Sequence, residues 1–290
     1  MTIALTGAGG SIGRALVACA ALNGNALTVF PTRTQLDLAG PLEPLKAWLA
    51  VRWPDAIIHL AGRRHGGDAA AAVRDNVAAT YNLLEAVASL QRPVRVVVAS
   101  SADVYGDARG RGKLAIGAER RPMSVYGVSK ALQEDTCTLA RASHGTDVSV
   151  ARIFNIFGAP GDTWSVIPNM IARIGASADG ATLHVTNARC VRDFVHIDDV
   201  CSALLLASTQ PSIPRVFNIA TGIETAIGDI ARRIAESLHR NIDLRFDDGV
   251  DATTILDSIG DPEETIAMGW KYRAISNSDI RALSAYSAAG

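Results

Sequence analysis

The sequence predicts an α/β fold in which a doubly wound parallel sheet is followed by a smaller C-terminal domain. The first indication is a series of short segments rich in β-branched residues. Each is nearly continuous in apolar residues, as expected of strands that are covered on both faces. These segments are 2–7, 26–30, 56–62, 94–101 and 148–158. The second is that amphipathic, helix-like segments separate them, at 11–22, 41–52, 72–89 and 124–143. Such a βαβα order favours a parallel sheet with right-handed crossovers.

The division of the chain follows from a change of rhythm after about residue 160, where the segments become less regular. We predict a first domain over 1–160 and a smaller second domain mostly over 161–290. Segments within about 191–222 are expected to return to the first domain. A chain of 290 residues with 48% apolar residues is large enough to bury a full-sized core of this kind.

The composition and charge of the chain limit the kinds of molecule that it is expected to bind. The net charge is −1, with 28 basic and 29 acidic residues, which gives no electrostatic basis for binding nucleic acid or a membrane surface. No apolar run reaches the roughly 18 residues of a membrane span. Met1 leads directly into a predicted strand, so we expect no signal peptide and a cytoplasmic location. The four cysteines do not have the spacing of metal ligands, so we expect no metal site and reduced thiols. They are Cys19, Cys137, Cys190 and Cys201.

A glycine-rich turn follows the first predicted strand. In "TGAGGSIG", Gly7, Gly10 and Gly13 recur at intervals of three and open the first helix. Glycines at this point let the backbone approach a pyrophosphate placed at the helix N-terminus. The context of strand, turn and helix is the one that a Rossmann-type dinucleotide site requires.

The end of the second predicted strand bears on the choice of dinucleotide. An acid there suits the ribose hydroxyls of NAD, whereas an arginine suits the 2′-phosphate of NADP. The stretch "TVFPTRTQLDL" has Arg33 near the strand end and no acid before Asp37, which would lie near the adenine. We therefore expect NADP, with NAD still possible.

A tyrosine and a lysine stand four residues apart in "SVYGVSKA", on a predicted helix. Positions i and i+4 share one face of a helix, so Lys130 can lie one turn from the phenol of Tyr126. A nearby ammonium favours the phenolate. The pair could therefore serve as an acid and base near neutral pH. Alone, this spacing is common on helix surfaces, and other motifs must decide.

Several motifs occur together in one order. They are "TGAGGSIG", "IIHLAG", "SSADVYG", "YGVSK" and "RDFVHIDDV". Taken together they resemble the extended short-chain dehydrogenase/reductases, and among these the NAD(P)-dependent epimerase/dehydratase family that acts on nucleotide sugars. The likeness runs from Thr2 to "MGW" at 268–270. It implies a Rossmann domain, a small C-terminal substrate-binding domain, and a homodimer paired through the helix that carries the Tyr/Lys motif and its neighbour.

The resemblance also implies roles for individual residues. Ser101, Tyr126 and Lys130 match the catalytic triad of the family, in which the phenol transfers the proton. Asp103, Asn155 and Arg192, together with Ser101, are the expected sugar and diphosphate contacts. The expected dinucleotide contacts, besides the Tyr/Lys pair, are Gly7, Gly10, Ser11, Ile12, Gly13, Arg33, Asp37, Leu38, Leu60, Ala61, Gly62 and Asn76.

Three reactions share this triad: 4-epimerisation, 4,6-dehydration and reduction of a 4-keto sugar. Dehydratases of the family carry an Asp-Glu pair directly after the catalytic Thr, where this chain has Ala102 and Asp103. The run "TRTQLDLAG" resembles the NADP-dependent GDP-fucose synthase branch, although that branch has a cysteine in place of Asp103. We expect reduction of a 4-keto-6-deoxy nucleotide sugar, with a nucleotide-sugar 4-epimerase that holds NAD tightly as the alternative. The intact triad argues against a non-catalytic dinucleotide sensor.

Several charged residues have more ordinary explanations. His59 lies within a predicted buried strand, and His196 is expected to be a packed structural histidine. His65, Arg63 and Arg64 follow the third strand near the predicted pocket and are weaker substrate candidates. Arg245 is the candidate for a second phosphate-binding arginine.

Overall fold

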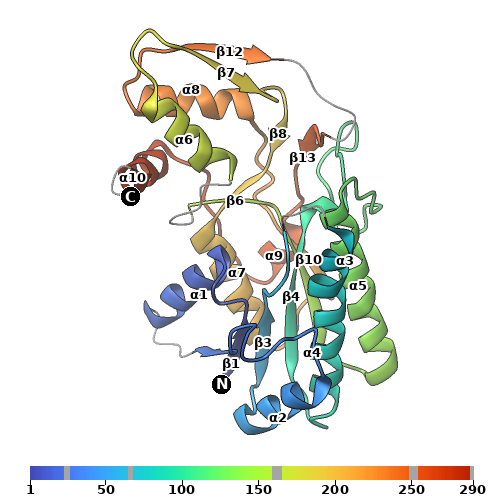
Figure 1. Ribbon diagram of the computed structural model, residues 1–290. Helices are drawn as coiled ribbons and strands as arrows, with labels where there is room; N and C mark the ends of the chain where they lie inside the picture. The colour runs from blue at the N-terminus through green and yellow to red at the C-terminus, as the bar shows by residue number, and fades with distance from the viewer. Residues whose placement is uncertain (23–26, 65–67, 159–164, 248–253, 288–290) are drawn as a thin grey trace.

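The computed structural model describes residues 1–22, 27–64, 68–158, 165–247 and 254–287. Figure 1 shows a larger lobe built on a central sheet and a smaller lobe above it, to which the C-terminal third of the chain contributes most. The smaller lobe covers one end of the central strands. That end is where a site can form between the two lobes.

The central sheet has six strands in the order β10-β5-β4-β3-β1-β2, and every neighbouring pair is parallel. The strands are β1 (Ile3–Thr6), β2 (Leu27–Val29), β3 (Ala56–His59), β4 (Arg95–Ser101), β5 (Val148–Ile153) and β10 (Val216–Ile219). The order reverses at β1, which has β2 on one side and β3 on the other. Ligands of open α/β sheets bind beyond the carboxyl ends of the strands at such a reversal. The predicted fold class is confirmed.

Helices cover both faces of this sheet (Figure 1). One face carries α2 (Leu42–Arg52), α4 (Ala79–Ala88) and α5 (Val125–His144), and the other carries α1 (Ser11–Leu22) and α7 (Ile197–Thr209). Consecutive residues of one strand therefore point to opposite faces of the sheet and pack in different hydrophobic cores. Ile57 packs with Leu49 and Leu83 under the first group of helices, whereas Ile58 packs with Leu16 and Leu204 under the second. Both isoleucines are fully buried, which explains why the strands read as continuous apolar runs.

Two predicted elements are subdivided. The run 148–158 leaves the central sheet after β5, and its second part, β6 (Asn155–Phe157), pairs with β9 (Phe194–His196) instead. The predicted helix 72–89 consists of α3 (Ala69–Ala72), a π-helical segment η1 (Val73–Ala78) and α4. The π-helical segment contains Asn76, whose side chain is fully buried.

The smaller lobe has its own apolar core, formed largely by α6 (Val166–Ala176), α8 (Ile227–Ser237) and α10 (Asn277–Ser287). Short strands complete it: β7 (Thr182–Thr186) with β12 (Asp243–Asp247), and β8 (Val191–Arg192) between β11 (Thr225–Ala226) and β13 (Asp257–Ser258). The 3-10 turn η2 (Ala102–Val104) follows β4, and α9 (Glu263–Ala267) contacts β10. The chain crosses between lobes more than once, because α7 and β10 pack in the larger lobe after β7 and β8.

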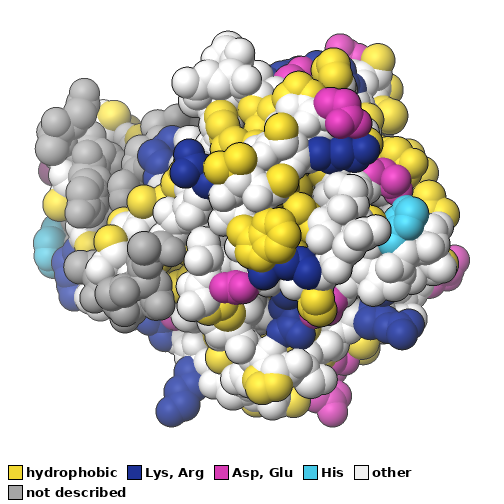
Figure 2. Space-filling model, turned by 90° about the horizontal axis from the view of Figure 1, so that it is seen from below, with side chains coloured by type: hydrophobic (Ala, Val, Ile, Leu, Met, Phe, Trp, Pro, Cys, Tyr) yellow, Lys and Arg dark blue, Asp and Glu magenta, His cyan; other side chains and the backbone are white. Residues whose placement is uncertain are grey.

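The surface is mixed in character. Figure 2 shows acidic and basic side chains interspersed over the described part of the face seen from below. Among the described residues, no helix combines the length and apolar character needed to cross a membrane.

Candidate functional site

The turn after β1 is shaped by two glycines that have no room for a side chain. Gly7 has φ +71°, and a Cβ there would lie 2.6 Å from the backbone nitrogen of Ala61. A Cβ on Gly13 would lie 2.6 Å from the Cα of Ala8, so α1 packs directly on the turn. Gly9 and Gly10 are exposed, with the N-terminus of α1 beside them. This combination of open backbone and free helix N–H groups fits a dinucleotide pyrophosphate.

The segment after β3 forms the wall next to this turn. The hydroxyl oxygen of Thr6 accepts hydrogen bonds from the backbone N–H groups of Leu60 and Ala61, at 3.1 Å each. Asn76 holds the following residues by bonding both the N–H and the C=O of Arg63, at 2.7 and 3.0 Å. A Cβ on Gly62 would come within 2.6 Å of the Asn76 amide oxygen. Of the predicted residues, Leu60 and Ala61 therefore lie against Gly7, and Gly62 lies against Asn76.

Ser101, Tyr126 and Lys130 come together from β4 and α5. Ser101 is the last residue of β4, and its hydroxyl donates to the carboxylate of Asp103 at 3.2 Å. The same hydroxyl is near enough to the phenol of Tyr126 to lower its pKa. Ser124 caps α5 by accepting from the N–H of Gly127 at 2.9 Å, which sets the helix start one residue before Tyr126. The Nζ of Lys130 lies 5.9 Å from the centre of the Tyr126 ring.

The electrostatics of the phenol differ from the expectation that Lys130 lowers its pKa. Burial, with the negative charge of Asp103 adding to it, raises the pKa of Tyr126 to about 12, although Ser101 and Arg64 oppose the shift. The ammonium of Lys130 is directed elsewhere, donating to the backbone oxygen of Ala99 at 2.7 Å. Burial also lowers the pKa of Lys130 to about 8. In this structure the phenol is a proton donor at neutral pH.

Arginines and aspartates gather near the end of β2. Arg33 forms a two-pronged ion pair with Asp75, at 3.0 and 3.1 Å. Arg63 bonds the same carboxylate at 2.8 Å and Arg74 at 3.0 Å, and Arg74 also pairs with Asp37. Three guanidinium groups thus face two carboxylates, which leaves an excess of one positive charge. The amide of Asn82 braces the neighbouring turn by donating to the oxygen of Leu38 at 2.9 Å.

The predicted substrate contacts lie where the smaller lobe meets the sheet. Asn155 is the first residue of β6, and its backbone N–H bonds to the oxygen of Asp193 at 3.1 Å. Arg192 on β8 donates to the backbone oxygens of Leu256 and Ile255, at 2.8 and 2.6 Å. Burial lowers the pKa of Arg192, and the charge of Asp103 is among the groups that oppose this. Arg192 therefore braces the segment at Ile255 and Leu256 of the smaller lobe.

A cavity of about 290 Å³ adjoins Leu256, to whose backbone oxygen Arg192 donates. Its charged lining is balanced, with two arginines and two aspartates: Arg109, Arg189, Asp247 and Asp257.

The other predicted residues have structural surroundings. His59 is fully buried, and His196 packs edge-on against Phe157 at 5.0 Å while it caps α7. Arg245 is exposed and pairs with Asp243 at 2.8 Å on β12, at the outer end of the smaller lobe (Figure 1). The structure thus places Arg245 away from the Ser101–Tyr126 pair. His65 lies outside the described residues.

Comparisons with known proteins agree with this arrangement. Residues 3–220 match the model of the NAD dependent epimerase/dehydratase family. This chain belongs to that family. The predicted family, and with it an NAD(P)-dependent enzyme, is confirmed.

Relatives within the family differ in reaction. The chain is 31% identical over 242 residues to a GDP-6-deoxy-D-mannose reductase of Pseudomonas aeruginosa, covering 80% of this chain and 78% of that protein. It is 26% identical over 211 residues to a UDP-glucose 4-epimerase of Mycoplasma genitalium, covering 66% of this chain and 62% of the relative. A solved structure described as RMD from Pseudomonas aeruginosa complexed with NADPH superposes with a TM-score of 0.85 at 26% identity, over 98% of each chain.

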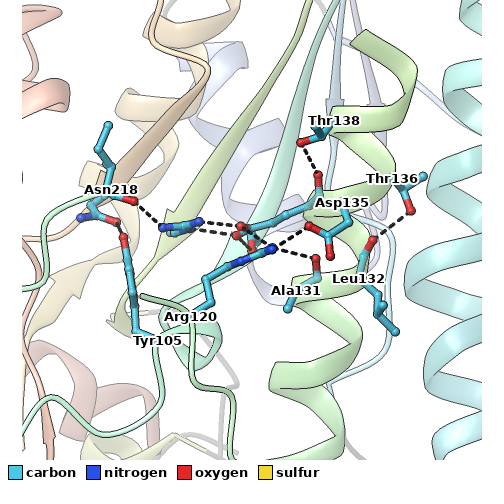
Figure 3. A network of polar contacts seen from close by, with 12 residues as sticks. Tyr105, Arg120, Ala131, Leu132, Asp135, Thr136, Thr138 and Asn218 are labelled. Atoms are coloured by element: carbon cyan, nitrogen blue, oxygen red, sulfur yellow. Dashed lines mark hydrogen bonds and ion pairs between the residues drawn. The ribbon is translucent and has the colours of Figure 1, made fainter. Parts of the chain in front are cut away.

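Sequence reasoning missed the buried polar groups behind the triad. Glu134 pairs with Arg152 at 2.7 Å, accepts from Ser100 at 2.6 Å, and so ties α5 to β4 and β5. Arg152 lies over the ring of Tyr105. The hydroxyl of Tyr105 donates to Asn218 on β10 (Figure 3). A charged residue on the apolar face of an amphipathic helix, as at Glu134, is the signal that could have revealed this network.

Proposed function

We propose that this protein is an NADPH-dependent oxidoreductase that reduces a 4-keto-6-deoxy nucleotide sugar at C4. The observation that carries the proposal is geometric: Tyr126 and Lys130 lie together on α5 beside the end of β4, and the Nζ of Lys130 is 3.8 Å from where a Cβ on Gly62, in the wall of the dinucleotide site, would lie. Reduction of a ketone needs a proton donor at the carbonyl oxygen, and a protonated phenol supplies it. The reductase relative and the NADPH complex support the same direction.

Each group of the proposed triad has one task. Tyr126 donates the proton to the C4 oxygen, and Ser101 hydrogen-bonds the same oxygen and orients it. Lys130 gives two N–H groups to Ala99 and Gln133, so one of its three remains for the ribose of the cofactor. The bound nicotinamide supplies the hydride.

The proposed cofactor contacts follow the wall described above. The turn from Gly7 to Gly13 takes the pyrophosphate, with Ser11 and Ile12 at the helix N-terminus. Asp37 and Leu38 lie at the adenine, and Asn76 acts by holding the wall. Arg33 takes the 2′-phosphate. Its side chain is 55% exposed and so can be reached by a ligand, whereas the side chain of its partner Asp75 is only 11% exposed.

The substrate is proposed to lie between the lobes, with the larger lobe binding the dinucleotide and the smaller lobe the sugar nucleotide. Asn155 and Asp103 would contact the sugar, and Arg192 the diphosphate.

The alternative is a 4-epimerase that keeps NAD bound throughout its cycle, which the epimerase relative supports. Dehydration is disfavoured because Ala102 stands where the dehydratases carry an acid. One experiment separates the first two. The purified protein is examined for bound NAD(H) by its absorbance, and then mixed with NADPH and a GDP-linked 4-keto-6-deoxy sugar. Stoichiometric oxidation of NADPH is expected; tightly held NAD without net oxidation would instead establish an epimerase.

A homodimer through α4 and α5 is also proposed. Apolar side chains are exposed along α5 at positions 125, 128, 132 and 139, and Tyr81 is exposed on α4. Spacings of three, four and seven residues place these α5 side chains along one stripe of the helix. Such a stripe fits the same stripe of a second copy. We also propose a cytoplasmic location, in keeping with the buried thiols of Cys137, Cys190 and Cys201.

A further inference from the structure

Lys130 is bonded to a glutamine that neither the sequence motif nor the triad accounts for. The Nζ of Lys130 donates to the Oε1 of Gln133 at 2.7 Å, and both side chains are buried. An ammonium can only donate, so Oε1 is the acceptor and the amide nitrogen of Gln133 is left as a donor. That nitrogen lies 2.7 Å from the hydroxyl of Thr80.

The direction of each hydrogen bond made by the Thr80 hydroxyl is also fixed. It donates to the backbone oxygen of Asn76 at 2.7 Å, which uses its only hydrogen. It must therefore accept from both of its other partners, Gln133 and the Nε2 of His59 at 2.9 Å. Hence His59 carries its hydrogen on Nε2.

The chain of bonds continues from His59 to the wall of the cofactor site. Burial lowers the pKa of His59 to about 3, so the ring is neutral and its Nδ1 accepts. The donor is the hydroxyl of Thr6 at 2.8 Å, which in turn accepts from the N–H groups of Leu60 and Ala61. All of these hydroxyls and ring nitrogens are satisfied, and reversing one bond would break its neighbours.

We propose that Gln133 is a positioning residue for Lys130 and that it ties the lysine to the wall at Leu60 and Ala61. The tie runs through Thr80, His59 and Thr6. This inference rests on the proposed role of Lys130 at the cofactor ribose. The wall touches the glycine turn, since a Cβ on Gly7 would meet Ala61 and Leu60. The lysine and the turn are thus held at one fixed separation, as two contacts with the same dinucleotide require.

The test is the affinity for NADPH as a function of pH, measured by nicotinamide fluorescence without any sugar. Other groups that act on Lys130 or face it are His59 on β3 and, on α5, Tyr126, Glu134 and Cys137. Gln133→Leu removes the acceptor and should weaken binding about tenfold. It should also move the loss of affinity at high pH down by about one pH unit, because the ammonium loses a stabilising bond.

Gln133→Glu should move the same loss of affinity up by about one unit, because a carboxylate favours the ammonium. General damage to the helix cannot produce opposite shifts. Thr136→Val is the matched control, because Thr136 lies on the same helix and its hydroxyl donates to the backbone oxygen of Leu132, away from the Lys130–Gln133 bond (Figure 3). Its affinity profile should match that of the wild type. Equal profiles for Gln133→Leu and the wild type would overturn the inference.

A second measurement needs no variant. Nitrogen NMR of the imidazoles should show His59 neutral, with the hydrogen on Nε2, from pH 5 to 9. A hydrogen on Nδ1, or titration near pH 6.5, would also overturn the inference. If the wild type bound neither NADPH nor NADH, the proposed function itself would fail, which is a distinct outcome.

Discussion

The ammonium of Lys130 and the phenol of Tyr126 share one face of α5, yet the ammonium bonds to the backbone of β4 and not to the phenol. The Nζ of Lys130 lies 5.9 Å from the centre of the phenol ring, and Ser101, not Lys130, is among the groups that lower the pKa of the phenol. In the proposed mechanism this separates two tasks. Tyr126 supplies the transferred proton, and Lys130 supplies the fixed positive charge beside the cofactor.

Tyr126→Phe should separate these tasks in experiment. Removing the hydroxyl removes the proton donor, so turnover should fall by about 10²- to 10⁴-fold. The Kd for NADPH should stay within about twofold, because Lys130 and the glycine turn are untouched. Initial rates and fluorescence titration measure the two effects. Tyr81→Phe, at an exposed position on α4, is the control and should keep full turnover. Undiminished turnover in Tyr126→Phe would mean that the proton comes from elsewhere.

Arg33→Ala should change the choice of dinucleotide. Charged hydrogen bonds to a phosphate would be lost, so NADPH should bind about 10- to 100-fold more weakly, with NADH almost unaffected. Titration with both dinucleotides gives the ratio of the two Kd values. Arg232→Ala is a suitable control, because that arginine is similarly exposed but pairs with Asp229 in the smaller lobe. An equal loss for NADH and NADPH would show that Arg33 only supports the fold.

His59 should make the protein sensitive to acid. An unfolded histidine takes up a proton near pH 6.5, whereas burial lowers the pKa of His59 to about 3. Between these values the unfolded chain binds more protons, so the free energy of unfolding decreases as the pH falls from 6.5 towards 3. The loss is on the order of 4–5 kcal/mol at pH 3.

His59→Gln keeps one donor and one acceptor but cannot titrate, so its denaturant midpoint should depend less on pH over this range. His144→Gln is the matched control, because His144 is partly exposed and pairs with Glu85. The idea fails if both variants lose stability with acid as steeply as the wild type does.

Association through α5 can be tested with one charge. Leu132→Glu places a carboxylate in the exposed stripe and should convert a dimer to a monomer in sedimentation, because burying an unpaired charge at an interface costs several kcal/mol. Val51→Glu, on the exposed side of α2, should leave the mass unchanged. A wild type that sediments as a monomer at micromolar concentration would refute the dimer.

The fold could be predicted from the sequence because its signals are local. Strands that are covered on both faces must be apolar throughout, and the predicted run 94–101 matches β4 (Arg95–Ser101) almost residue for residue. The run 148–158 gave no sign that it divides at Phe154, because β6 leaves the sheet to pair with β9, about forty residues later. Pairings of that kind depend on the tertiary structure and leave no periodic pattern.

The positions of the candidate site residues were predictable where a sequence motif fixes their geometry. Their pKa values and hydrogen-bond partners were not, because these depend on burial. The spacing of Tyr126 and Lys130 correctly placed both on one helix face. It could not show that burial and Asp103 raise the pKa of the phenol, or that Gln133 and Ala99 take two of the lysine's hydrogen bonds. Desolvation depends on the residues that pack around a group. The sequence of one helix does not reveal which residues these are.

Glu134 should be the most sensitive position behind the site. Its carboxylate accepts hydrogen bonds from both Nε and Nη2 of Arg152, at 2.9 and 2.7 Å. Each of the two side chains is only 6% exposed. The next residue, Asp135, pairs with Arg120 at 2.6 Å on the same helix, but it is 56% exposed (Figure 3). One helix therefore presents a buried and an exposed ion pair side by side, and Arg120 also reaches Glu134 at 3.4 Å.

Glu134→Gln would set an amide NH₂ against the guanidinium and leave a buried charge unpaired. The free energy of unfolding should fall by about 3–5 kcal/mol. Asp135→Asn should cost only about 0–1 kcal/mol, because water screens its pair. Chemical denaturation measures both. Since Glu134 also accepts from Ser100, next to Ser101, its loss should lower kcat more than it raises KM. Equal stability losses in the two variants would show that burial does not decide the strength of these pairs.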